Sequence, residues 1–128
     1  MIRVMNVRGL NRPDQRAGIV YVGRPFAGWP GHPLANPLGV SRWATASAVG
    51  DCLSRYADWL DARPTLAADL AALWAACEGG RLPLGCWCCE AVIRPRSMGT
   101  DGRPTRCHAE ILAARLIDRF GGQTEDCE

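Results

Sequence analysis

Five side chains that can bind a metal or act as nucleophiles lie at the two ends of one segment: Cys86, Cys88, Cys89, Cys107 and His108. The apolar run 82–87 predicts a buried strand before this segment, and the apolar spacing of residues 109–120 predicts a helix after it. In α/β proteins, ligands commonly bind beyond the carboxyl end of a strand, facing the N-terminus of a helix. We therefore expect the chemistry of this protein to lie at that junction.

The residue types at the junction first suggest a metal site. Side chains two positions apart on a strand share a face, so Cys86 and Cys88 should point the same way, and Cys107 and His108 arrive from the far side of the loop. Three thiolates and an imidazole suffice for tetrahedral zinc, and such soft ligands also suit iron. The sequence predicts a metal site of Cys86, Cys88, Cys107 and His108, although the spacing is not that of a regular zinc ribbon.

Two other interpretations of the same residues stay open. A cysteine at a helix N-terminus has its thiolate stabilised by the helix dipole, which lowers its pKa and makes it nucleophilic. Cys107 fits that position and His108 could serve as its base, so both are catalytic candidates. Alternatively, Cys86 and Cys88 only fill a buried strand and His108 only caps the helix.

A loop rich in glycine and proline supplies candidates for ligand binding. Gly23 lets the chain turn closely after the predicted strand 18–22, and Arg24 can bind an anion. Asn36 could hydrogen-bond a base or its own backbone. Ordinary turn chemistry, with Arg24 in a surface ion pair, is the alternative, and His32 fits a loop histidine better than a metal ligand.

The composition narrows the class of protein. All fifteen basic residues are arginine, which excludes a Schiff-base lysine and a phosphate-binding loop lysine. The net charge of +2 is too small to imply nucleic-acid binding by itself. No apolar run reaches the roughly 18 residues of a membrane span, and the first residues lack signal-peptide features. We expect a cytoplasmic protein with no membrane association, whose cysteines are reduced.

The elements that must position these residues alternate between strand and helix. The patterns predict strands at 2–7, 18–22 and 82–87, and helices from Thr45 or Ser47 to 63, from Thr65 to 78, and over 109–120. We predict one small α/β domain over residues 1–122, with a mostly parallel, Rossmann-like sheet flanked by about three helices, and a polar tail at 123–128. Three strands are few for a sheet, so one of the loops could contain another.

Several segments together resemble a family of bacteria and their phages catalogued as domain of unknown function 4326. The early matching segments are Asn6-Val7-Arg8-Gly9, Tyr21-Val22-Gly23-Arg24-Pro25 and Leu34-Ala35-Asn36-Pro37. The later ones are Arg55-Tyr56-Ala57-Asp58-Trp59-Leu60, Leu84-Gly85-Cys86-Trp87-Cys88 and Cys107-His108-Ala109-Glu110-Ile111-Leu112. The resemblance implies an α/β core and a site shared by Arg24, Asn36, Cys86, Cys88, Cys107 and His108. The Cys-x-Cys and Cys-His elements also look like those of domain of unknown function 488, and neither family implies a known reaction.

Two function hypotheses follow. In the first, the protein is an enzyme, a hydrolase or transferase acting on a nucleotide or nucleoside, in which Arg24 binds the anion, Asn36 binds the ring or sugar, and the cysteine–histidine cluster holds zinc or supplies a thiol. In the second, zinc only stabilises the fold, and the arginine-rich surface of residues 94–106 contacts a protein or nucleic acid. The phage association of the family would also allow an inhibitor of a host defence system.

Overall fold

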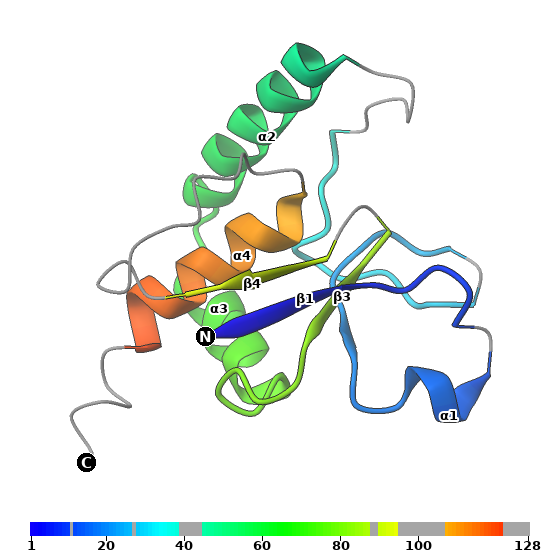
Figure 1. Ribbon diagram of the computed structural model, residues 1–128. Helices are drawn as coiled ribbons and strands as arrows, with labels where there is room; N and C mark the ends of the chain where they lie inside the picture. The colour runs from blue at the N-terminus through cyan, green and yellow to red at the C-terminus, as the bar shows by residue number, and fades with distance from the viewer. Residues whose placement is uncertain (11, 27, 39–44, 88–89, 95–106, 122–128) are drawn as a thin grey trace.

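The computed structural model describes residues 1–10, 12–26, 28–38, 45–87, 90–94 and 107–121. The strands in this part of the chain are β1 (Ile2–Asn6), β2 (Val20–Tyr21), β3 (Leu84–Cys86) and β4 (Ala91–Ile93). The helical elements are α1 (Pro13–Arg16), α2 (Ala46–Asp61), α3 (Leu66–Ala76), α4 (His108–Leu116) and the π-helical turn η2 (Ile117–Gly121). The protein is therefore a small domain of mixed α/β content, as predicted (Figure 1).

The four strands form one sheet in the order β2-β3-β1-β4. β3 pairs in parallel with both β1 and β2, with Leu84 opposite Val4 and Val20, whereas β4 is antiparallel to β1. Because β1, β2 and β3 run the same way, their carboxyl ends lie at one edge of the sheet. The residues that follow these three strands are therefore brought together.

α4 packs on the face of the sheet to which Ile2 and Val4 point, and α2 and α3 pack against α4. α4 contacts β1, β3 and β4 as well as α2 and α3, so it lies at the centre of the helical layer (Figure 1). Ile2 and Val4 are buried in this core, while Arg3 and Val92 are exposed on the opposite face. The alternation of buried and exposed residues along β1 is the period of two that its sequence predicts.

A smaller apolar cluster of Val7, Tyr21 and Trp29, with Ile19 and Trp87 packed against it, lies beside β3. Gly85 lets this cluster approach the strand, because a Cβ atom there would lie 2.8 Å from both Val7 and Ile19. A side chain at this position would have to displace packed residues, which explains why the middle of this short buried strand carries none.

Most predicted elements are present, with shifted ends. Thr45 caps α2, its hydroxyl accepting a hydrogen bond from the Ala48 amide at 3.1 Å. At the start of α3, Thr65 instead donates its hydroxyl hydrogen to Asp69 at 2.7 Å, so the expected backbone cap is not made.

Two short elements were not assigned by the sequence. The segment between β1 and β2 contains the single helical turn α1, and the segment after Cys89 contains β4, a fourth strand in a loop. The predicted tail 123–128 and most of the arginine-rich segment, 95–106, lie outside the described residues. Within the described part, no helix is long and apolar enough to cross a bilayer.

Candidate functional site

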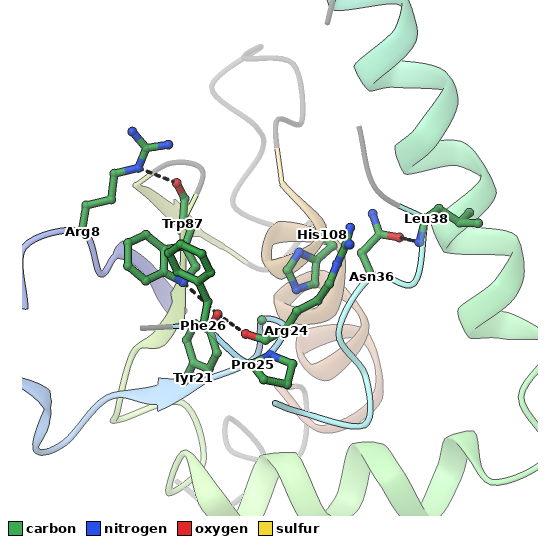
Figure 2. Close-up of a pocket in the computed structure, with 10 residues that line it drawn as sticks. Arg8, Tyr21, Arg24, Pro25, Phe26, Asn36, Leu38, Trp87 and His108 are labelled. Carbon is green, nitrogen blue, oxygen red and sulfur yellow. Dashed lines mark hydrogen bonds between the residues drawn. The ribbon is translucent and has the colours of Figure 1, made fainter. Parts of the chain in front are cut away.

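A pocket of about 750 Å³ lies at the carboxyl edge of the parallel strands (Figure 2). Arg8 follows β1, Trp87 follows β3, the loop after β2 forms the floor, and His108 begins α4. The described residues that line it are Arg8, Tyr21, Gly23, Arg24, Pro25, Phe26, Asn36, Leu38, Trp87 and His108. The pocket thus brings together four residues singled out from the sequence, Gly23, Arg24, Asn36 and His108. A volume of this size suits a small-molecule ligand.

Three aromatic side chains form one side of the pocket, here called the aromatic wall: Tyr21, Phe26 and Trp87. The Trp87 indole donates its Nε1 hydrogen to the Tyr21 hydroxyl at 2.8 Å, and that hydroxyl donates to the Arg24 carbonyl at 2.5 Å. Phe26 packs edge-on against Trp87, with ring centroids 5.0 Å apart. These contacts fix the loop that carries Arg24 relative to the sheet.

The aromatic wall requires a glycine at position 23, because the Tyr21 side chain lies against it. A Cβ atom at Gly23 would lie 2.5 Å from the Tyr21 hydroxyl oxygen, which is closer than real Cβ contacts allow. We expect Gly23→Ala to break the bond from Tyr21 to Arg24 and to lower the free energy of unfolding by about 1–3 kcal/mol, as for other overpacked sites. Urea denaturation would measure the change.

Gly50 offers a matched control for that substitution. It lies within α2 and a Cβ atom there would meet nothing within 4 Å. Because glycine disfavours a helix interior relative to alanine, Gly50→Ala should stabilise the protein by about 0.5–1 kcal/mol. If both variants shift stability in the same direction, the close approach at Gly23 does not have the effect we assign to it.

Two arginines supply positive charge to the pocket. The Nε of Arg8 donates to the Trp87 carbonyl oxygen at 3.1 Å, which holds that side chain beside the aromatic wall. Arg24 lies near His108, and its charge is one of the influences that lower the pKa of that imidazole. Both arginines are exposed, and the described residues that line the pocket include no carboxylate.

Asn36 serves mainly to shape its own loop. Its Oδ1 accepts from the Leu38 amide at 2.8 Å, and its Nδ2 donates to the Cys52 sulfur at 3.5 Å. The Cys52 thiol in turn donates to the Leu38 carbonyl at 2.9 Å. This is the backbone-bonding alternative for an asparagine in a turn, although a second Nδ2 hydrogen remains for a ligand.

His108 lies at the wall opposite Trp87 and is 8% exposed. Its Nε2 lies 2.9 Å from the Val22 carbonyl oxygen, and its Nδ1 lies 3.7 Å from the Cys107 sulfur. A carbonyl can only accept, so Nε2 carries the hydrogen and Nδ1 keeps a lone pair. Burial is the main cause that lowers the pKa of His108, so the imidazole is neutral at pH 7.

The two described cysteines of the cluster lie deeper than the pocket. Cys107 is the N-cap of α4 and is 1% exposed, and Cys86 is fully buried in β3. Within the described part of the chain no group of three or more metal-binding side chains is present, and Cys88 and Cys89 lie outside that part.

His32, the other histidine, takes part in the loop after β2. Its Nδ1 accepts a hydrogen bond from the Leu34 amide at 3.0 Å, and its own amide donates to the Gly23 carbonyl at 3.0 Å. Burial lowers the pKa of His32, in keeping with a neutral ring whose Nδ1 is an acceptor. These contacts are those of a structural loop residue.

The comparison with protein families gives one match. Residues 5–118 match the family described as a domain of unknown function, DUF4326. The chain belongs to the DUF4326 family. No curated protein and no solved structure matches it.

The DUF4326 match spans every described residue that lines the pocket. Sequence reasoning missed six of them as binding candidates: Arg8, Tyr21, Pro25, Phe26, Leu38 and Trp87. A signal was available for three, because Arg8, Tyr21 and Trp87 each lie at or just after the end of a strand at the edge where ligands bind. No such signal exists for Pro25, Phe26 and Leu38, whose positions depend on the path of the loop after β2.

Proposed function

We propose that this DUF4326 protein binds a nucleotide, a nucleoside or a closely related ligand in the pocket at the carboxyl edge of the sheet. One observation carries the proposal: two arginines and three aromatic side chains line the same pocket, without a carboxylate among its described residues. Aromatic faces bind planar bases by stacking, and guanidinium groups bind phosphate. The combination suits a ligand with a flat ring and an anionic group.

The placement of the side chains suggests how such a ligand would lie. Phe26 and Trp87 offer an aromatic surface for the base, and Arg24 would bind the phosphate beside His108. The remaining amide hydrogen of Asn36 would contact the sugar or ring. We further infer that the sheet, in which β1, β2 and β3 are parallel, is a small variant of the Rossmann-like class.

The burial of Cys107 and the contacts of His108 support ligand binding rather than thiol chemistry. Cys107 is buried and is not among the described residues that line the pocket, and both ring nitrogens of His108 face protein atoms. A nucleophile and a general base must reach the substrate to act on it. Catalytic roles for Cys107 and His108 therefore stay predictions, and a hydrolase or transferase activity needs a movement of this segment.

Calorimetric titration with AMP, GMP, CMP and UMP, each beside its nucleoside, tests the proposal. We expect the monophosphates to bind about tenfold or more tightly than the nucleosides, since a bond to a charged group contributes about 1.5–3 kcal/mol. Arg24→Gln should remove most of that difference. Arg3→Gln is the control, because Arg3 lies in β1 on the exposed face of the sheet. Equal affinity for nucleotide and nucleoside, or no binding at all, would refute the proposal.

A zinc site of Cys86, Cys88, Cys107 and His108 is a second proposal. A histidine that binds a metal through one nitrogen commonly donates its other N–H to a backbone carbonyl. His108 has this arrangement, because Nε2 faces Val22 and the lone pair of Nδ1 faces the Cys107 sulfur. Thiolates and an imidazole are ligands that zinc prefers, and zinc bound by them would stabilise the fold by joining β3 to the start of α4.

Elemental analysis of protein purified under reducing conditions tests the zinc site. We expect about one zinc per chain, as in structural sites with four ligands. Cys107→Ser should lose the metal, whereas Cys52→Ser should keep it, because the Cys52 thiol bonds to Asn36 and Leu38 instead. Wild-type protein without stoichiometric metal would exclude the site.

A further inference from the structure

We propose that the ligand of this pocket is one nucleotide of a single-stranded nucleic acid, with Arg8 and Arg24 binding the phosphates on either side of a stacked base. The inference rests on the proposed function and names its substrate class. A free mononucleotide needs only one cationic contact, whereas a strand presents a phosphate before and after each base. The two arginines supply two such contacts.

The arginines lie at different ends of the pocket. Arg8 lies beside the aromatic wall, where its Nε bonds to the Trp87 carbonyl, and Arg24 lies beside His108 (Figure 2). Trp87 and Phe26 lie between them in this view. A cation, an aromatic surface and a second cation are thus arranged in series, which is the pattern that binds single strands without sequence preference.

The bond to Trp87 leaves the terminal nitrogens of Arg8 able to bind an anion. It uses only the Nε hydrogen, and the side chain is exposed. A guanidinium held at Nε still presents the N–H groups of both terminal nitrogens. Because the described lining residues include no carboxylate, the charge of Arg8 is not neutralised within the pocket.

The exposure of Phe26, one of the residues that line the pocket, gives a second reason to expect a polymer. Phe26 is 63% exposed, although its edge packs against Trp87. When the first base lies on Trp87, the exposed ring of Phe26 can stack on the next base of a strand, whereas a mononucleotide has no second base to place there. The small net charge of the chain, +2, does not weaken this inference, because the two charges are concentrated at one site.

Titration of the whole chain with dTMP and with thymidine oligonucleotides of two, four and eight residues tests the inference. UMP and the matching uridine oligonucleotides form a second arm that separates RNA from DNA. We expect affinity to rise about tenfold between the mononucleotide and the longer strands, because a second phosphate and a second base are bound. The affinity for the octamer should fall with salt with a logarithmic slope of about −1.4, or about −0.7 for each phosphate contact.

Substituting each arginine in turn distinguishes the phosphate contact of Arg8 from that of Arg24. Arg8→Gln should reduce the salt slope for the octamer to about −0.7 and should weaken the binding of the octamer more than that of dTMP, because only the strand presents a second phosphate to Arg8. Arg24→Gln should weaken the binding of both ligands, and Arg3→Gln should affect neither. If dTMP binds through Arg24 but the octamer binds no more tightly, the inference fails and the proposed function stands. If no mononucleotide and no strand binds, both fail.

Discussion

Tyr56→Ala is expected to lower the free energy of unfolding by about 3–5 kcal/mol, the range for removing a buried aromatic ring. Tyr56 lies in α2 and is fully buried. Its ring stacks on Trp59 with centroids 5.6 Å apart and meets the edge of His108 at 5.4 Å, and its hydroxyl donates to the Leu34 carbonyl at 2.6 Å. The side chain therefore joins α2, α4 and the loop that carries Asn36.

Tyr56→Phe separates the ring from the hydroxyl. It keeps the packing but leaves the Leu34 carbonyl without its partner in a buried position, which should destabilise the protein by about 1–3 kcal/mol. Both variants can be measured by urea unfolding. A loss below about 1 kcal/mol for Tyr56→Ala would mean that α2 is not held to the rest of the domain in the way the contacts indicate.

Trp87→Ala is expected to reduce the affinity of the pocket for AMP about tenfold or more, because base–aromatic stacking contributes about 1–3 kcal/mol for each base. The substitution removes the ring against which Phe26 packs and the donor that bonds to the Tyr21 hydroxyl. The loop that carries Arg24 would lose its hydrogen-bonded connection to the end of β3. Calorimetric titration measures the loss.

Trp87→Phe should have a smaller effect, because it keeps a stacking surface and removes only the bond to Tyr21. Trp74→Phe is a control, since Trp74 stacks on Phe120 in a different part of the core and is not among the described residues that line the pocket. If Trp74→Phe weakens binding as much as Trp87→Ala, the losses reflect general destabilisation and the ligand does not stack on Trp87.

The strand and helix content could be predicted because it depends on local pattern. The alternation along β1, the threonine cap of α2 and the apolar spacing of α4 are visible in the sequence and are present in the structure. The short strand β4 was not predicted, because the three residues Ala91–Ile93 are too few to show the alternation of buried and exposed residues that marks a strand. Its place in the sheet comes from antiparallel pairing with β1, which is a long-range contact.

The position of the pocket was more predictable than the chemistry of its residues. Parallel strands place the residues that follow them at one edge, so Arg24 and His108 could be expected near each other. The contribution of Phe26 and the burial of Cys107 depend on the course of loops, which local spacing does not determine. Whether Cys88 joins Cys86, Cys107 and His108 remains a prediction, since Cys88 lies outside the described residues.

The backbone carbonyl groups of the loop after β2 also bear on which ligands the pocket should bind poorly. The carbonyl oxygens of Val22, Gly23 and Arg24 each accept a hydrogen bond from another part of the protein: an imidazole, a backbone amide and a phenol. These three successive carbonyl oxygens are thus hydrogen-bonded within the protein, while the guanidinium group of Arg24 stays exposed. The described lining residues carry two guanidinium groups and no carboxylate, so we expect amines and other cationic metabolites to bind less well than anions of similar size and shape.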